Sequence, residues 1–252
     1  MGRIDRRLGR AVQTALRLVY PARCLGCGGI VESDFGLCGP CWAETPFIGG
    51  LACDLCGAPL PGGDPDEIAH CDDCLRTPRP WHRGRAVMLY EDLGRRLVLG
   101  LKHGDRLDIA APAAFWMVDT AAPLLQDGMI VAPIPLHWRR RVSRGYNQSA
   151  EISRRLARRL QDRGALDLPD LLCRPRATPS LDGKSAADRF AALGDRLVVT
   201  PARRAALVGR PVLLIDDVMT SGATFSAATR ACLDAGSGPV SVLALARAVK
   251  AP

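Results

Sequence analysis

The sequence predicts an α/β protein with a mainly parallel sheet, preceded by a small cysteine-rich, metal-binding region. Eight of the ten cysteines lie between Cys24 and Cys74, and strand-like runs alternate with helix-like runs after residue 80. Strands that alternate with helices are typical of parallel sheets with crossover helices. Of the 252 residues, 48% are hydrophobic and 24% are charged, which excludes a mostly disordered chain.

The chain divides into three regions. Residues 1–23 predict an amphipathic basic helix, and we expect it to pack onto the domain that follows. The alternative is a peripheral contact of this helix with a membrane surface or a partner. Residues 24–80 form the cysteine-rich domain, which ends in a proline-containing linker at 77–80, and residues 81–252 form the α/β domain.

Four strands and three helices are expected after residue 80. Short apolar runs predict strands over residues 86–90, 129–136, 212–215 and 240–245. Helical spacing of apolar residues predicts helices over 92–102, 147–163 and 225–235. Asn147 is a suitable N-cap for the second of these helices because its side chain can accept from a free backbone amide.

The sequence contains no membrane-spanning or export segment that we can identify. No run of about 18 apolar residues occurs, and no apolar stretch follows the N-terminal arginines as a secretory signal requires. We therefore expect a cytoplasmic protein with reduced cysteines, which favours metal ligation over disulfides.

The net charge of +8 comes almost wholly from arginine, since the chain has only three lysines: Lys102, Lys184 and Lys250. The excess of positive charge is concentrated in residues 1–23 and 139–159. It indicates two arginine-rich faces and is not by itself evidence of a general affinity for nucleic acid.

Four C-x2-C pairs carry the metal prediction: Cys24 and Cys27, Cys38 and Cys41, Cys53 and Cys56, and Cys71 and Cys74. Two such pairs place four thiolates tetrahedrally around one zinc ion, and four thiolates leave no open position for catalysis. We therefore predict two structural zinc sites, with iron–sulfur clusters or redox thiols as the alternative. The pairing of the turns on the two ions stays open at this point. Cys173 and Cys232 lie in apolar runs and are interpreted as small buried residues.

Residues 212–224 carry a second chemical pattern. An apolar strand leads to the adjacent carboxylates of Asp216 and Asp217, at the strand end where ligands bind in open α/β sheets. A turn with Thr220, Ser221 and Gly222 then opens a helix, whose first amides attract anions. This order suits an anionic sugar with magnesium bridging. A plain strand end followed by a helix cap is the alternative.

This run resembles the phosphoribosyl pyrophosphate (PRPP) signature of type I phosphoribosyltransferases. From Cys24 to about Arg247 the chain resembles the ComF family, which joins a double zinc ribbon to a phosphoribosyltransferase domain and is linked to DNA uptake in natural competence. The resemblance also covers Leu101-Lys102 before Gly104, residues 133–136 and residues 144–148. It implies a type I phosphoribosyltransferase-like sheet.

The resemblance assigns roles to particular residues. Asp216 and Asp217 would hold the ribose hydroxyls, residues 220–224 the 5′-phosphate, and Lys184, on a loop over 174–189, the leaving pyrophosphate. A solvated Lys184 is the alternative, and Lys102 either reaches a phosphate or caps its own helix. The PRPP-binding set, with magnesium bound to PRPP, is Lys102, Arg144, Asp216, Asp217, Val218, Met219, Thr220, Ser221, Gly222, Ala223 and Thr224; the catalytic set is Asp216, Asp217 and Lys184.

The chain departs from the family pattern in the expected loop. Ser180 stands where the family usually has glutamine, Asp188 where it has glutamate, and Ala192 where it has asparagine. PRPP binding is therefore a firmer expectation than turnover.

Two functions remain open from the sequence. The first is phosphoribosyl transfer to an unidentified acceptor. The second is a non-catalytic adaptor that senses PRPP or a nucleotide and contacts single-stranded DNA or the DNA-uptake machinery. DNA contacts to phosphates would make the affinity fall steeply with salt.

Overall fold

The computed structural model describes residues 21–32, 36–65, 67–103, 106–136, 146–174 and 197–249. The chain forms two compact units, Met1–Thr45 and Pro46–Pro252. The first unit contains the first two C-x2-C pairs, and the second contains the other two pairs together with the sheet. Most of the helix predicted over 1–23 and most of the loop expected over 174–189 lie outside the described residues.

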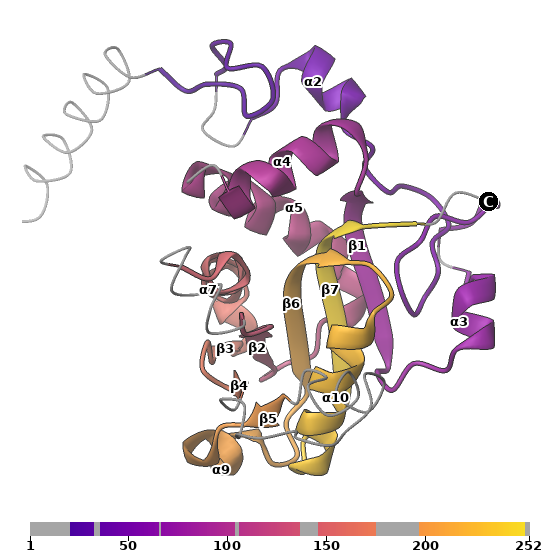
Figure 1. The fold of residues 1–252 in the computed structure, drawn as a ribbon, viewed down its shortest axis with the longest axis vertical. Coiled ribbons are helices and arrows are strands. Elements are labelled where there is room, and N and C mark those ends of the chain that lie inside the picture. The colour runs from indigo at the N-terminus through magenta and orange to yellow at the C-terminus, as the bar shows by residue number, and fades with distance from the viewer. Residues whose placement is uncertain are drawn as a thin grey trace, which may run out of the picture. The chain divides into compact units, whose positions relative to one another are not determined.

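The second unit is built on a five-stranded sheet, and every pairing in it is parallel. The order of the strands across the sheet is β1-β7-β6-β2-β3 (Figure 1). This arrangement confirms the α/β fold with a mainly parallel sheet. A separate antiparallel pair is formed by β4 and β5. The strands are β1 (Arg83–Leu89), β2 (Ile130–Pro133), β3 (Leu166–Asp167), β4 (Leu172–Cys173), β5 (Val198–Val199), β6 (Val212–Met219) and β7 (Val240–Arg247).

Helices precede and connect these strands (Figure 1). The α-helices are α2 (Gly39–Glu44), α3 (Asp72–Arg76), α4 (Asp92–His103), α5 (Ala110–Ala121), α7 (Gln148–Arg159), α9 (Arg204–Leu207) and α10 (Ala223–Asp234). Short 3-10 turns occur at Leu107–Ile109, Ala122–Leu124, Gln161–Arg163 and Pro201–Arg203. Within the described part of the chain, no helix is long and apolar enough to cross a bilayer.

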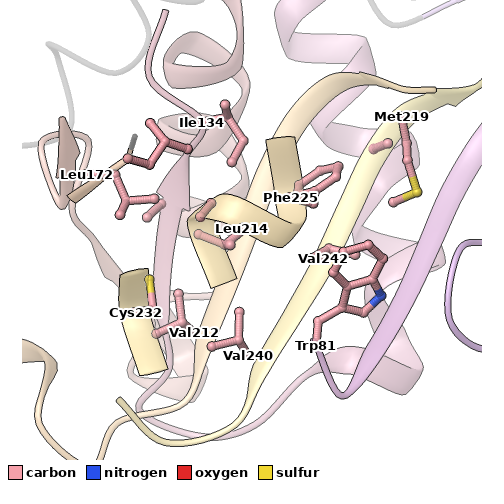
Figure 2. Close-up of a cluster of buried hydrophobic side chains, with 14 of the residues drawn as sticks. Trp81, Ile134, Leu172, Val212, Leu214, Met219, Phe225, Cys232, Val240 and Val242 are labelled. Atoms are coloured by element: carbon pink, nitrogen blue, oxygen red, sulfur yellow. The ribbon is translucent and has the colours of Figure 1, made fainter. Parts of the chain in front are cut away.

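Both faces of the central strand β6 are covered, as parallel sheets require. The first four residues of β6 are all buried, and successive side chains of a strand point to opposite faces. Val212 and Leu214 belong to one buried cluster with Phe225 and Cys232 of α10 (Figure 2). Leu213 and Ile215 therefore face the opposite side of the sheet. The prediction that Cys232 is a small buried residue is confirmed.

The sequence-based bounds were wrong at several places. The strand predicted over 129–136 is only Ile130–Pro133, and the helix predicted over 147–163 ends at Arg159. The strand predicted over 212–215 continues to Met219, because β7 pairs with it up to Arg247. The sequence analysis also missed α5, whose alanine-rich run is apolar on more than one face. Strand β3 was missed because two residues carry no readable period.

Candidate functional site

The first two cysteine pairs meet in the first unit. The Sγ atoms of Cys24, Cys27, Cys38 and Cys41 all lie within 4.8 Å of one another. Cys38 Sγ lies 3.6 Å from Cys24 Sγ and 3.7 Å from Cys27 Sγ, and the backbone amide of Cys38 donates to Cys24 Sγ at 3.3 Å.

The other two pairs meet in the second unit. The Sγ atoms of Cys53, Cys56, Cys71 and Cys74 also lie within 4.8 Å of one another, and Cys56 Sγ is 3.6 Å from Cys71 Sγ. Cys53, Cys56 and Cys74 are buried, whereas Cys71 is partly exposed. We call this group the second cysteine cluster. The pairing that the sequence left open is thus sequential along the chain.

Both clusters fit zinc. Sulfur lies near 2.3 Å from zinc, so the sulfur–sulfur edge of a tetrahedral site is about 3.8 Å. The observed separations of 3.6 and 3.7 Å match that edge. They are far longer than a disulfide bond, which is about 2.05 Å. The structure therefore supports two closed, structural zinc sites with four cysteines each.

The acidic pair lies on a part of β6 that extends beyond its neighbour. β2 pairs with β6 only as far as Pro133, which is opposite Ile215. β7 accompanies β6 four residues further, to Met219. Because β2 stops first, no described strand pairs with β6 on that side at Asp216 and Asp217. Both residues therefore lie within the strand and not in the turn after it.

Helix α7 supplies a contact that the sequence analysis missed. Ser149 Oγ donates to Asp216 Oδ1 at 2.9 Å, and the backbone amide of Asp217 donates to the same oxygen at 2.9 Å. Burial, aided by the negative charge of Asp217, nevertheless raises the pKa of Asp216 to about 7. Asn147 caps α7 as predicted, since its side chain accepts from the amide of Ser149.

Lys102 reaches the acidic pair from the end of α4. Its Nζ lies 2.9 Å from Asp217 Oδ1, and the side chains of Lys102 and Asp217 are 21% and 9% exposed. Two side chains hold the carbonyls of this helix end: Tyr146 Oη donates to Leu101 O at 3.0 Å and Gln148 Nε2 to Lys102 O at 3.4 Å. These contacts bring the end of α4 and the start of α7 to the same edge of the sheet.

The turn after β6 has the form expected of an anion-binding loop. Gly222 is the N-cap of α10 in the left-handed conformation, with φ of +78°, and has no side chain to satisfy the first amides of the helix. Thr220, Ser221 and Ala223 are exposed, and Thr224 is partly exposed. Met219 is buried in the core and Val218 is partly buried, so Met219 offers its backbone and not its side chain. We call residues 219–224, most of which the resemblance predicts to bind the 5′-phosphate, the phosphate loop.

Two of the predicted site residues lie outside the described part of the chain, namely Arg144 and Lys184. The described residues Lys102, Asp216 and Asp217 and the phosphate loop share one edge of the sheet. The sequence analysis missed three further residues at this edge, which are Ser149, Arg79 and Arg247. Only Arg247 had a signal, because it ends an apolar strand.

Comparisons with known proteins extend over most of the chain. A family described as Double zinc ribbon domain matches residues 15–75. The chain is 30% identical to the DNA utilization protein YhgH of Salmonella typhi over 237 residues, which cover 91% of this chain and 99% of that protein. It is 27% identical to Competence protein F of Haemophilus influenzae over 243 residues, or 90% and 97% of the two chains.

A third relative aligns over a shorter part of the chain. Competence protein ComFC of Bacillus subtilis is 25% identical over 217 residues, which cover 82% of each chain. These alignments include both the zinc-ribbon region and the sheet, in agreement with the two four-cysteine clusters and the parallel α/β fold. The chain therefore belongs to the ComF family of competence and DNA utilization proteins.

Proposed function

We propose that this protein binds PRPP, or a related phosphoribosyl ligand, together with magnesium at the edge of the sheet formed by Asp216, Asp217 and the phosphate loop. One observation supports the proposal most strongly. The acidic pair is on the part of β6 that extends beyond β2, directly before a loop that opens a helix of 12 residues. Carboxylates accept from sugar hydroxyls, and the first amides of a helix attract phosphate.

The charges around the acidic pair suit a polyanionic ligand with a metal ion. Lys102 pairs with Asp217, and burial raises the pKa of Asp216 to about 7, so that it is partly protonated near neutral pH. Magnesium brought by the ligand would favour the ionised carboxylates. The ammonium of Lys102 would then be available to the phosphate groups. Arg144 and Lys184 are proposed to contribute further positive charge.

A transfer reaction at this site would break the bond between C1 of the ribose and the pyrophosphate oxygen. The acceptor would supply the electron pair of the new bond to C1 and lose its proton to solvent, and pyrophosphate would leave with the electron pair of the broken C1–O bond. Asp216 and Asp217 would orient the ribose hydroxyls and stabilise the positive charge that develops on the sugar ring. Such catalysis is mostly electrostatic and needs no covalent intermediate.

We propose a role in competence or DNA utilization, because the names of the relatives refer to these processes.

Within α7, Arg154 and Arg155 both pair with Glu151, and Arg159 lies 5.3 Å above the ring of Phe115. These contacts neutralise part of the arginine face that a DNA contact would use. We therefore propose PRPP binding as the primary function. Contact with single-stranded DNA is proposed only for the alternative, in which the protein is a non-catalytic adaptor.

Calorimetric titration of the full chain with PRPP tests the proposal. Binding is expected with magnesium and is expected to weaken at least tenfold without it or in Asp217→Asn. Asp234→Asn is the matched control, because Asp234 is exposed at the far end of α10. No heat of binding from wild-type protein with PRPP and magnesium would refute the proposal.

Product analysis then separates the two functions. Binding with release of pyrophosphate in the presence of nucleobases or other acceptors indicates a transferase. Binding without turnover, together with single-stranded DNA binding that weakens steeply with salt, indicates the adaptor.

A further inference from the structure

The second cysteine cluster is directly connected to the phosphate loop by Arg79. The Arg79 side chain is only 5% exposed, and its Nη1 donates to the carbonyl oxygen of Ser221 at 2.7 Å. Its Nη2 donates to the carboxylate of Asp73, which lies next to Cys74 in α3. One side chain thus spans from the residue beside a zinc ligand to the turn that opens α10.

Trp81 makes a second connection. Its Nε1 donates at 2.6 Å to the carbonyl oxygen of Leu55, which lies between Cys53 and Cys56. The indole packs edge-on against Phe225 in the first turn of α10, with ring centroids 6.2 Å apart (Figure 2). A Cβ atom at Gly222 would lie 2.9 Å from Trp81 Cη2. The indole therefore supports the phosphate loop from the side of the second cysteine cluster.

Arg247 completes the support from the end of β7. Its side chain is buried, and its Nη1 donates to the carbonyl oxygens of Met219 at 3.2 Å and Thr220 at 2.6 Å. Arg247 and Arg79 together hold three successive carbonyls, those of Met219, Thr220 and Ser221.

This arrangement fixes the direction of the loop amides. In a trans peptide the carbonyl of one residue and the amide of the next point in opposite directions. Holding the carbonyls of Thr220 and Ser221 toward the arginines turns the amides of Ser221 and Gly222 away from them. Those two amides precede the first turn of α10, which is part of the proposed anion site and in which the amide of Ala223 donates to Ser221 Oγ at 3.4 Å.

We propose that zinc binding at the second cysteine cluster and anion binding at the phosphate loop are thermodynamically linked, with Arg79 as the positioning residue between them. The inference rests on the proposed function, because it concerns the regulation of that same site. When zinc is bound, Leu55, Asp73 and Cys74 have fixed positions, and Arg79 and Trp81 are held against the loop. When zinc is lost, these anchors are lost, and the loop amides are no longer aligned. Linkage is reciprocal, so the anion must also retain the zinc.

The first experiment measures affinity for PRPP with magnesium in two zinc-loaded variants of the full chain. Arg79→Gln is expected to keep both zinc ions and to bind about tenfold more weakly, since linkage between two sites is typically 5- to 150-fold. Arg76→Gln is the matched control, because Arg76 lies three residues before Arg79 at the end of α3 and is exposed, pairing with Asp72 on the surface. Its affinity is expected to equal that of the wild type.

The second experiment measures zinc release to a coloured chelator, a readout that a merely structural role would not change. PRPP with magnesium is expected to slow the release of one of the two zinc equivalents in the wild type and in Cys38→Ser, which retains only the second cluster. PRPP with magnesium is expected to have no effect on zinc release from Arg79→Gln. It is also expected to have no effect on release of the zinc that remains in Cys71→Ser. Arg79→Lys, which keeps the charge but has no fork of donors, is expected to restore little of the protection.

The outcomes distinguish the linkage from the proposed function. If wild-type protein binds PRPP with magnesium and Arg79→Gln binds it equally well with unprotected zinc, the linkage is wrong and the proposed function stands. If the wild type binds only inorganic pyrophosphate, the PRPP assignment fails and the same two experiments, run with pyrophosphate, decide the linkage. If it binds neither, both proposals are refuted.

Discussion

Lys102 Nζ lies 2.9 Å from Asp217 Oδ1, so an ion pair links the end of α4 to the part of β6 that extends beyond β2. The sequence suggested either a helix cap or a phosphate ligand for Lys102. Its ammonium compensates the carboxylate of Asp217, whose side chain is 9% exposed. A ligand that uses both groups must therefore separate this pair.

Removing one partner of this ion pair is expected to cost more than removing both. Lys102→Met leaves Asp217 uncompensated beside Asp216, at a cost on the order of 3 kcal/mol. Adding Asp217→Asn removes the uncompensated charge, so the double variant is expected to be less destabilised than the sum of the single variants by at least about 1 kcal/mol. Urea unfolding of the four zinc-loaded proteins measures this coupling. Strict additivity of the two substitutions would show that the pair contributes nothing.

The stability of the protein is expected to depend on the ionisation of Asp216. Because its pKa is raised to about 7 in the folded chain, the folded state binds more protons than the unfolded state. The contribution of Asp216 to the free energy of unfolding is fully present below about pH 4 and is lost as the pH rises through about 7.

Asp216→Asn tests this dependence, since the amide oxygen still accepts from Ser149 and cannot ionise. The variant is expected to melt above the wild type at about pH 8.5, by a difference equivalent to at least about 1 kcal/mol, and the gain is expected to shrink toward about pH 5.5. Thermal melts in matched zinc-containing buffers check it. The same variant is expected to lose PRPP binding, and a gain in stability that is equal at all pH values would contradict the assignment.

Gly222 is expected to tolerate alanine much less well than Gly209. Both glycines are in the left-handed region, with φ of +78° and +69°, so both substitutions carry a backbone strain of about 1–2 kcal/mol. Only at Gly222 would the new Cβ also meet Trp81 and Arg79, at 2.9 and 3.2 Å, whereas nothing lies within 4 Å at Gly209. Gly222→Ala is expected to be the less stable by at least a further 1 kcal/mol or so, because overpacking in a core typically costs about 1–3 kcal/mol.

Chemical denaturation of the two variants, side by side, isolates the contacts of the new Cβ with Trp81 and Arg79. Equal losses would show that the phosphate loop yields freely at Gly222 and is not held by the indole.

The purified protein is expected to contain two zinc ions per chain. Cys38→Ser and Cys71→Ser each remove one ligand from a different cluster and are expected to leave about one ion, since each site needs four thiolates. Cys232→Ser is the control that leaves two, because Cys232 is a buried residue of α10 and belongs to neither cluster. Elemental analysis of protein made without added zinc measures the content, and less than one zinc per wild-type chain would exclude the assignment.

Zinc also determines which thiols react. In native protein the eight ligand cysteines are expected to be protected from thiol reagents and to become reactive when a chelator removes the metal. Reactive ligand cysteines in zinc-loaded protein would contradict closed sites.

Local patterns in the sequence determined much of this protein. The four C-x2-C turns specify two metal clusters because each turn brings its own two thiolates together, whatever surrounds it. The apolar strand before Asp216 and Asp217, and the glycine before the helix, are likewise adjacent in sequence, so their order was readable. The parallel α/β class followed from the alternation of strands and helices, and both clusters and this class are confirmed.

Only the tertiary structure decided which distant residues complete the site. No local sequence pattern predicts that Lys102 pairs with Asp217 or that Ser149 bonds to Asp216. These contacts exist only because α4, α7 and β6 reach one edge of the sheet. Arg79 lay in a stretch that the sequence marked as a linker, yet it is buried and bonded to Ser221, 142 residues away. The length of β6 beyond β2 depends on how far each neighbouring strand continues, which is a property of the packed sheet and not of β6 itself.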